Sequence, residues 1–524
     1  CVFFLYLRLA ASRGGPSGAD PSEILPFGVA ASAFLLFMPS NVAYSLAGRF
    51  DHHVMEPLVV TLPLLMAAGR GRRRLRGLAA GGLLCGLGSA FFPAAPAISF
   101  PMFLLAGTFL YGTAEAVARS GGMMLGVALS LLVSPSPSEW IYYSPSLWHL
   151  ATAAGLSCGL IACHGFRSLA DGRVRSRARA IFLGAAAGIA ALAAAGALAW
   201  FLFPQWWTAV AEGLQYASSS GFAALSLEAS SFRDDPARMM DLTGWLAPLA
   251  VAGLAWAAIP AASGRRRPGM AAFIAATIAY SILAAGQRRF LVAATPLLAV
   301  AAAFGLHWVT SLLIHGIPRL RERRGLVTAA LTAALLIMPL KSIGGMEYLA
   351  PRDRAMYAAA EAIAASGKGD RGTLAPWGYG HLMKYAGDAP TVCDNFFGVP
   401  GADAALHRCL SLLYATDDNS ISEELTNLQI RFVVLTPPHP EQIRAETGLI
   451  GLNPADWVDG QGRLSGRFAR SFAGRTGMWA STAPIGASGP FNLTLRGRFR
   501  QVDPSTRSVE AEVLLLEYSP PESH

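Results

Sequence analysis

The segment Asp51, His52, His53 brings a carboxylate and an imidazole within two positions of each other. Side chains at positions i and i+2 of an extended turn point the same way, so Asp51 and His53 can share one divalent cation. Two ligands are too few for a catalytic metal, which also needs further donors and open positions. Taken alone, the triplet fits better as juxtamembrane residues that hydrate the membrane interface than as a metal site. We expect Glu56, three residues on, to face the interior of a helix bundle.

Two further segments carry charged residues of types that bind ligands. Glu228 ends the sequence Leu-Ser-Leu-Glu inside a long polar stretch, and it is either a third metal ligand or a solvated loop carboxylate. Arg288 and Arg289 lie between two apolar segments, on the side that carries few basic residues. Guanidinium groups bind phosphate oxygens bidentately, so this pair suits a lipid-linked phosphate or, equally, a lipid headgroup.

An aromatic turn follows further along the chain. Trp377 and Tyr379 are separated by one glycine and followed by another, and the sequence Cys-Asp-Asn-Phe-Phe-Gly begins at Cys393. Such a rigid aromatic lip can hold a small side chain or a peptide backbone. An aromatic turn buried in a core is the alternative interpretation.

The elements that position these residues are mostly membrane helices. Of the 524 residues, 53% are hydrophobic and 14% are charged, far below the charged fraction of about 25% in soluble domains. Hydropathy and basic runs predict about 12 spans between residues 1 and 341, at 1–10, 25–46, 54–69, 78–92, 97–115, 121–134, 146–164, 180–203, 242–261, 269–286, 289–315 and 325–341.

The net charge of +9 comes largely from arginine runs between the apolar segments. Runs of this kind mark the cytoplasmic side of a membrane protein, and these lack the interleaved aromatics of a nucleic-acid surface. We therefore expect no nucleic-acid partner. With these runs on the cytoplasmic side, Asp51, His53, Glu228 and the loop from Pro204 to Asp241 all face outward, and Trp206 and Trp207 at the start of that loop are expected in the interface belt.

Residues 342–524 have the composition of a mixed α/β soluble domain on the same outer side. A helix is expected at 352–366, a buried strand at 430–438, and antiparallel strands after about residue 468. Cys393 and Cys409 belong to this domain. In an oxidising compartment they are either a disulfide pair or two free thiols.

Together these segments resemble a known family, the catalytic subunit of N-oligosaccharyltransferase in its single-subunit bacterial and archaeal form. The resemblance rests on four motifs in order: Asp51-His52-His53, the segment ending in Glu228, Gly286-Gln-Arg-Arg-Phe-Leu, and the turn around Trp377. It covers nearly the whole chain. It implies a membrane domain of the C-type glycosyltransferase kind and transfer of a lipid-linked oligosaccharide to the asparagine of N-x-S/T sequences.

Residue by residue, the resemblance implies that Asp51, His53 and Glu228 hold Mn²⁺ or Mg²⁺, and that Asp51 and Glu228 are catalytic. Arg289, with Arg288 beside it, would hold the lipid pyrophosphate, and Trp377 and Tyr379 would bind the hydroxyl residue of the acceptor sequon. The implied partners are the lipid-linked donor, the acceptor polypeptide and membrane lipid. The implied location is the bacterial inner membrane, with the C-terminal domain in the periplasm.

Two departures from the family pattern stand out. The family motif Trp-Trp-Asp-Tyr-Gly has Pro376 in place of its first Trp and Gly378 in place of its Asp. A large first outer loop with another essential Asp is missing, which an N-terminus inside the second span would explain, and we expect little activity from a chain without that loop.

Other functions remain open on the residues alone. Another polyprenyl-phosphate-dependent glycosyltransferase, with an O-linked or lipid A acceptor, would not need the turn around Trp377. A transporter would show related halves and ionisable residues in mid-span. A non-catalytic membrane protein would tolerate substitution of Arg289.

Overall fold

The computed structural model describes residues 1–13, 21–40, 56–68, 74–91, 99–105, 112–141, 144–171, 176–218, 242–259, 268–287, 290–344, 351–367, 372–393, 402–502 and 507–520. These residues fall into two compact units. The described part of the first, a helical unit, ends at Gly344, and that of the second, an α/β unit, begins at Pro351.

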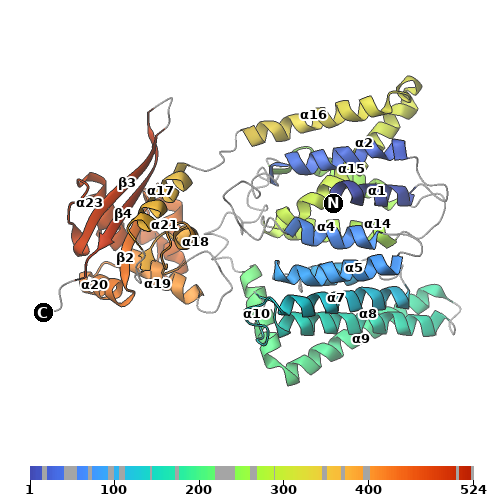
Figure 1. The fold of residues 1–524 in the computed structure, drawn as a ribbon, viewed down its shortest axis with the longest axis horizontal. Coiled ribbons are helices and arrows are strands. Elements are labelled where there is room, and N and C mark those ends of the chain that lie inside the picture. Colours follow the sequence, from blue (N-terminus) through green and yellow to red (C-terminus); the bar gives the residue numbers. More distant parts are fainter. Residues whose placement is uncertain are drawn as a thin grey trace. The chain divides into compact units, whose positions relative to one another are not determined.

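The helical unit consists of helices that run side by side (Figure 1). Among the described residues, five helices are long and apolar enough to cross a membrane, which fits a membrane domain; the finer number of about 12 spans stays a prediction. The elements are α1 (Val2–Arg13), α2 (Pro21–Phe37), α4 (Glu56–Ala67), α5 (Arg74–Leu87), η3 (Gly88–Ala90), α6 (Ser99–Leu105), α7 (Thr113–Leu131), α8 (Leu147–Asp171), α9 (Arg177–Leu202), α10 (Pro204–Ser218), α13 (Leu246–Ala258), α14 (Pro268–Gly286), α15 (Phe290–Gly316), η5 (Pro318–Leu320) and α16 (Arg324–Gly344).

Helix α15 is the centre of this unit. Every residue from 290 to 306 is buried, and α1, α2, α4, α13, α14 and α16 all pack against it. An apolar helix that is buried all round is an interior helix, whereas the far more exposed α9 turns most of its surface outward. The position of α15 therefore fixes the positions of its neighbours.

Helices α5 and α7 approach each other through glycines. A Cβ atom added to Gly82 or Gly86 of α5 would collide with the backbone of α7, and one added to Gly122 or Gly126 of α7 would collide with the backbone of α5. Both pairs have the Gly-x-x-x-Gly spacing, which lets helix backbones pack closely where lipid provides no hydrophobic drive for association. The contacts progress in the same direction along both helices, so α5 and α7 run parallel.

A half-buried histidine joins four helices at one end of the bundle. The Nδ1 atom of His307 lies 2.9 Å from the Tyr6 hydroxyl and its Nε2 atom lies 2.9 Å from Arg324 Nη2. Arginine can only donate, so Nε2 accepts, and in the neutral ring Nδ1–H donates to Tyr6. The Phe27 ring stacks on His307 at 4.2 Å. Residues of α1, α2, α15 and α16 are held together here.

Residues 204–218, which we expected to begin a long loop, form the helix α10. Its tryptophans pack against the preceding helices: Trp206 Nε1 donates to Thr152 Oγ1 at 3.0 Å and Trp207 Nε1 donates to the Gly196 carbonyl at 3.3 Å. These two indole hydrogen bonds attach α10 to α8 and α9. The sequence did not predict α10 because the polar residues that follow it obscure the helical periodicity of its apolar residues.

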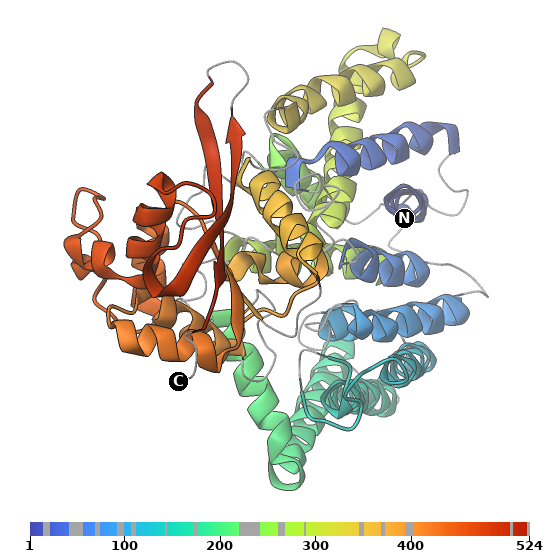
Figure 2. The same ribbon diagram turned by 60° about the vertical axis from the view of Figure 1, so that its left-hand side comes forward.

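The α/β unit has a four-stranded sheet between two layers of helices (Figure 2). The strand order is β1-β2-β4-β3, in which β1 and β2 are parallel and the other neighbours are antiparallel. The expected strand at 430–438 is confirmed as β2, and the expected antiparallel pair is confirmed as β3 and β4. The elements are α17 (Pro351–Ala365), β1 (Gly372–Leu374), η6 (Trp377–Tyr379), α18 (Gly380–Tyr385), α19 (Ala402–Tyr414), α20 (Asp418–Asn427), β2 (Ile430–Leu435), α21 (Pro440–Leu449), η7 (Pro454–Asp456), α22 (Gly466–Arg470), α23 (Phe472–Thr482), η8 (Pro490–Asn492), β3 (Leu493–Val502) and β4 (Val509–Tyr518).

Alternation along the strands divides the core in two. On one face Phe432, Val434 and Leu515 pack against the alanine-rich helix α17. On the other face Val433 and Leu516 join the larger cluster that includes α19 and α23. The period-2 pattern of β2 therefore buries both of its faces, as expected for a central strand.

An ion-pair network crosses three strands of this sheet. Glu517 of β4 accepts from Arg431 Nε of β2 at 3.0 Å and from Arg496 Nε of β3 at 2.6 Å. Partial burial alone raises the pKa of Glu517, but the hydrogen bonds and charges of the two arginines outweigh it and hold that pKa below its ordinary value. The carboxylate form is therefore favoured in the folded unit.

Replacing Gly122 by alanine should destabilise the helical unit, because the added methyl group must push α5 and α7 apart at the Ala79 carbonyl. Overpacking of this kind costs about 1–3 kcal/mol. Thermal unfolding in detergent should show a lower midpoint for Gly122→Ala. The adjacent Gly121→Ala is the matched control, since its added Cβ meets no atom within 4 Å. Equal midpoints for the two variants would contradict the close packing.

Acid should weaken the α/β unit partly through Glu517. Because its folded pKa is depressed, its contribution to stability is present above the unfolded pKa of about 4.3 and is lost as the pH falls through the folded pKa. Glu517→Gln should therefore flatten the loss of stability below about pH 4.5 in denaturant titrations. Glu510→Gln, an exposed position on the same strand, should leave the acid slope unchanged.

Candidate active site

The structure describes only part of the expected site. Asp51, His53, Glu228, Arg288 and Arg289 lie outside the described residues. The helices that lead into and out of their segments are described, so the ends of each segment have known positions. Trp377 and Tyr379 are described in full.

The segment with Asp51 and His53 is attached to the bundle beside the start of α15. Before it, the hydroxyls of Ser40 and Thr295 lie 2.9 Å apart, and both residues are fully buried. Thr295 is in the second turn of α15, so Ser40 lies close to the end at which that helix begins. After the segment, α4 begins at Glu56.

Helix α4 begins at this same end. The Cα atom of Ala68, just after α4, lies 3.2 Å from the position of a Cβ on Gly269 at the start of α14. At the other end of the pair, Val59 and Val60 of α4 line a cavity with Tyr280 of α14. Helices α4 and α14 are therefore antiparallel. Glu56 and Gly286, which precedes Gln287, Arg288 and Arg289, thus lie at one end of the bundle.

The segment with Glu228 also returns to this end. A Cβ on Gly244, just before α13, would lie 3.5 Å from Pro339 in α16. Helix α16 runs parallel to α2, because its first residue Arg324 pairs with Glu23 at 3.6 Å at the start of α2. Pro339 and the Gly244 turn therefore lie at the end where α2 finishes near Ser40.

We call this end of the helical unit the motif end, defined by Ser40, Glu56, Gly244, Gly286 and Phe290. The opposite end, the arginine end, holds Arg74, Arg167 and the segment Arg319–Arg324. All three segments that carry the expected metal ligands and phosphate-binding arginines join described helices at the motif end. In the sequence, Arg289 directly precedes α15, and the free N–H groups at the N-terminus of a helix favour anions.

The residues expected to hold a metal are two carboxylates and one imidazole, a donor set that suits Mn²⁺ and Mg²⁺. Among the residues that the structure describes, no group of three or more His, Cys, Asp or Glu side chains is arranged around a common point.

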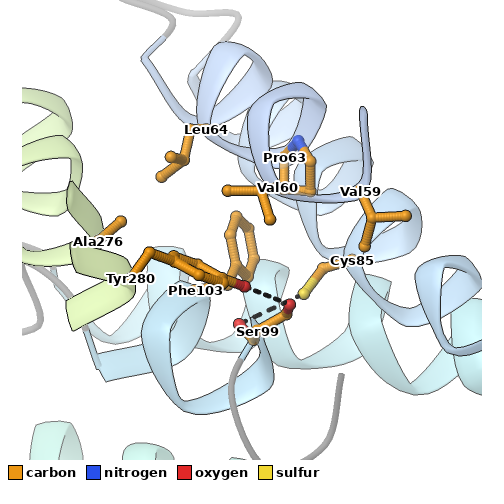
Figure 3. Close-up of a pocket in the computed structure, with 9 residues that line it drawn as sticks. All are labelled: Val59, Val60, Pro63, Leu64, Cys85, Ser99, Phe103, Ala276 and Tyr280. Atoms are coloured by element: carbon orange, nitrogen blue, oxygen red, sulfur yellow. Dashed lines mark hydrogen bonds between the residues drawn. The ribbon is translucent and has the colours of Figure 1, made fainter. Parts of the chain in front are cut away.

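Sequence reasoning placed Glu56 in the bundle interior, and its exposed fraction is 2%. As the first residue of α4, its carboxylate faces the favourable end of the helix dipole. Residues of α4, α5, α6 and α14 line a cavity of about 20 Å³ (Figure 3). The Ser99 and Tyr280 hydroxyls, 2.7 Å apart, form its polar wall. The volume suits one water molecule and is far too small for a sugar.

In the α/β unit, Trp377 and Tyr379 form the turn η6 at the carboxyl end of β1. Both are partly buried, but they pack on different clusters: Trp377 lies against the core that includes α19, and Tyr379 lies against the core under α17. The turn therefore sits across the edge of the sheet, with one ring anchored on each face. Crevices at the carboxyl ends of parallel strands are the usual ligand sites of open α/β sheets.

Gly378 separates the two rings and faces open space. A Cβ added there meets no atom within 4 Å. The first side-chain atom of any residue at this position therefore lies in open space. The departure at Gly378 is thus a change of chemistry and leaves the packing of the turn intact.

The chain was compared with known proteins at three levels. No protein-family model matches it, and no curated protein matches its sequence. Solved structures do match. Archaeal oligosaccharyltransferase AglB from Archaeoglobus fulgidus, in complex with an inhibitory peptide and a dolichol-phosphate, aligns with a TM-score of 0.66 over 96% of this chain and 71% of that one, at 14% identity. The fold is that of an archaeal oligosaccharyltransferase.

Other forms of the Archaeoglobus fulgidus enzyme agree. The apo form aligns with a TM-score of 0.66 over 96% of this chain and 72% of that one, and a complex with Zn and sulfate with 0.61 over 94% and 64%, both at 14% identity. Structural similarity at 14% sequence identity establishes the fold of the helical unit and of the α/β unit. The chain spans about two thirds of the length of the Zn-bound structure.

Proposed function

We propose that this protein transfers an oligosaccharide from a polyprenyl-(pyro)phosphate carrier to the asparagine amide of N-x-S/T sequences. The observation that carries the proposal is that described helices flanking three separate motif segments begin or end at one end of a helical unit with an oligosaccharyltransferase fold. Segments without a common role would be distributed over both ends of the helical unit. A shared end is what a single site built from distant parts of the chain requires.

In this proposal, Asp51, His53 and Glu228 hold Mn²⁺ or Mg²⁺. The bound ion supplies a positive charge that neutralises the departing pyrophosphate. Arg289, with Arg288 beside it, binds the pyrophosphate oxygens bidentately at the N-terminus of α15. Because α15 is buried along residues 290–306, this N-terminus is held rigidly, and rigid placement of the phosphate is itself a source of catalysis.

The acceptor amide is a poor nucleophile, because its nitrogen lone pair is delocalised into the carbonyl group. The Asp51 and Glu228 carboxylates accept hydrogen bonds from the amide N–H groups and orient the nitrogen toward the anomeric carbon. The amide nitrogen attacks the anomeric carbon from the face opposite the pyrophosphate, and the bond between that carbon and the pyrophosphate oxygen breaks with inversion. The amide nitrogen gives up one proton to a carboxylate of the site, and the lipid pyrophosphate leaves. The step needs no covalent intermediate on the protein.

The α/β unit supplies acceptor selection in this proposal. Trp377 and Tyr379 are anchored on opposite faces of the sheet, so the turn between them is rigid and can hold the hydroxyl residue of the sequon. Position 378 has no aspartate, so the aromatic rings and the backbone groups of the turn bind the hydroxyl residue. We expect weaker selection for Ser or Thr than an aspartate would give.

The two ends of the helical unit suggest its orientation. The basic residues of the arginine end favour the cytoplasm, which places the motif end and residues 342–524 on the periplasmic side of a bacterial inner membrane. Membrane lipid then surrounds residues 1–341 and their twelve proposed spans. The lipid-linked donor reaches the motif end from the outer leaflet, and the acceptor polypeptide from the periplasm.

The direct test is glycan transfer by the full-length gene product in membranes. With a polyprenyl-pyrophosphate glycan, Mn²⁺ and a fluorescent N-x-T peptide, we expect a metal-dependent shift of the peptide. Asp51→Ala, His53→Ala and Glu228→Ala should each lower the rate at least about 100-fold, a loss typical of removing a group that stabilises the transition state. His52→Ala is the matched control and should retain activity.

If folded protein gives no shift with several glycan donors, asparagine is not the acceptor. A glycan found instead on a serine, a threonine or a lipid would move the assignment to another membrane glycosyltransferase. Equal activity in all four variants would remove Asp51, His53 and Glu228 from the site.

Gly378→Asp tests the acceptor turn without disturbing the core. The added carboxylate enters open space and can accept a hydrogen bond from the Thr hydroxyl of the peptide, so KM for an N-x-T peptide should fall about threefold or more with kcat unchanged. Gly460→Asp, also in open space, is the matched control. No difference in KM between the two variants would place acceptor selection elsewhere.

A further inference from the structure

Two cysteines come together beside the aromatic turn. Thr391 pairs with Thr373 in a short parallel bridge, and Val392 N–H donates to the Thr373 carbonyl at 3.2 Å. Two residues further along each strand, this register places Cys393 next to Ala375. Cys393 is buried, with 7% of its surface exposed.

Cys409 reaches the same point from the helix α19. Its thiol lies 3.8 Å from the Ala375 carbonyl oxygen, and its surface is fully buried. Both cysteines belong to one apolar cluster. Both are reduced thiols in the structure. Two thiols that share one backbone neighbour from different elements have the arrangement that a disulfide needs.

We propose that Cys393 and Cys409 form a disulfide that fixes the chain behind the acceptor turn to α19. The inference rests on the proposed periplasmic position of this domain, because disulfides persist in oxidising compartments. Residues 394–401 and most of α19 are then enclosed in a closed loop. The strand edge that carries Trp377 gains a covalent attachment to the helix layer on one face of the sheet.

The bond forms by thiol–disulfide exchange with an oxidised dithiol oxidoreductase. The two cysteines give up two electrons and two protons, and the disulfide of the oxidoreductase is reduced to two thiols. The neighbouring Cys393 thiol and burial raise the pKa of Cys409 well above its ordinary value, which disfavours the reactive thiolate in the folded domain. Exchange therefore takes place while the exported domain folds, before α19 closes over the pair.

The test counts thiols in the full-length protein isolated from membranes. After denaturation and labelling with a maleimide–polymer reagent, the wild type should take up two more labels when it has first been reduced than when it has not. Cys393→Ser should take up the same number of labels in both states, because its partner Cys409 is released. Cys158→Ser, outside the pair, is the matched control and should still gain two labels on reduction.

A wild type that takes up the same number of labels with and without reduction would overturn the proposal, as would a Cys393→Ser protein that still gains two labels on reduction. Reduction before unfolding should also lower the melting midpoint of the wild type by about 5–10 °C and leave that of Cys393→Ser unchanged. Glycan transfer on the same preparation separates the two proposals. An active protein that gains no label on reduction contradicts only the disulfide, and an inactive protein with the disulfide contradicts only the proposed function.

Discussion

The complete burial of α15 over residues 290–306 is the constraint on which the helical unit depends. A helix enclosed by six others cannot shift without repacking all of them, so both of its ends are fixed points. One end carries the His307 network, which joins α1, α2 and α16. The other end follows directly on Arg288 and Arg289 and lies beside the Ser40–Thr295 contact, where the segment with Asp51 and His53 begins.

The remaining helices extend this frame by different means. Between α5 and α7, the interface consists of glycines, so the two helix backbones are in direct contact. Van der Waals contact between these backbones stabilises the pair in lipid, where burial of apolar side chains gives little stabilisation. In the α/β unit, ordinary burial on both faces of β2 holds the sheet, and Glu517 links three strands at its surface. The two kinds of packing reflect two solvents, which is consistent with one unit in lipid and the other in water.

Much of this architecture was predictable from the sequence, because hydropathy and arginine runs report on lipid and topology directly. The strand at 430–435 was equally clear, since its apolar run ends in two prolines. The helix α10 was missed because its polar residues resemble the loop that follows, and α7 begins at Thr113, well before the expected span at residue 121. The Ser99–Tyr280 contact and the opposite anchoring of Trp377 and Tyr379 depend on residues far apart in the chain, so no local pattern could reveal them.

In the proposed function, residues from three distant segments form one metal site at the motif end. Binding of Mn²⁺, followed by electron paramagnetic resonance of the purified full-length protein, tests it most directly. We expect one tight Mn²⁺ site. Either Asp51→Asn or Glu228→Gln should weaken its affinity at least about tenfold, the smallest loss usual when a residue that supports a metal site is changed. His52→Ala should leave the affinity unchanged. Tight Mn²⁺ binding that survives Glu228→Gln, or that needs Glu228 without Asp51, would contradict a shared site.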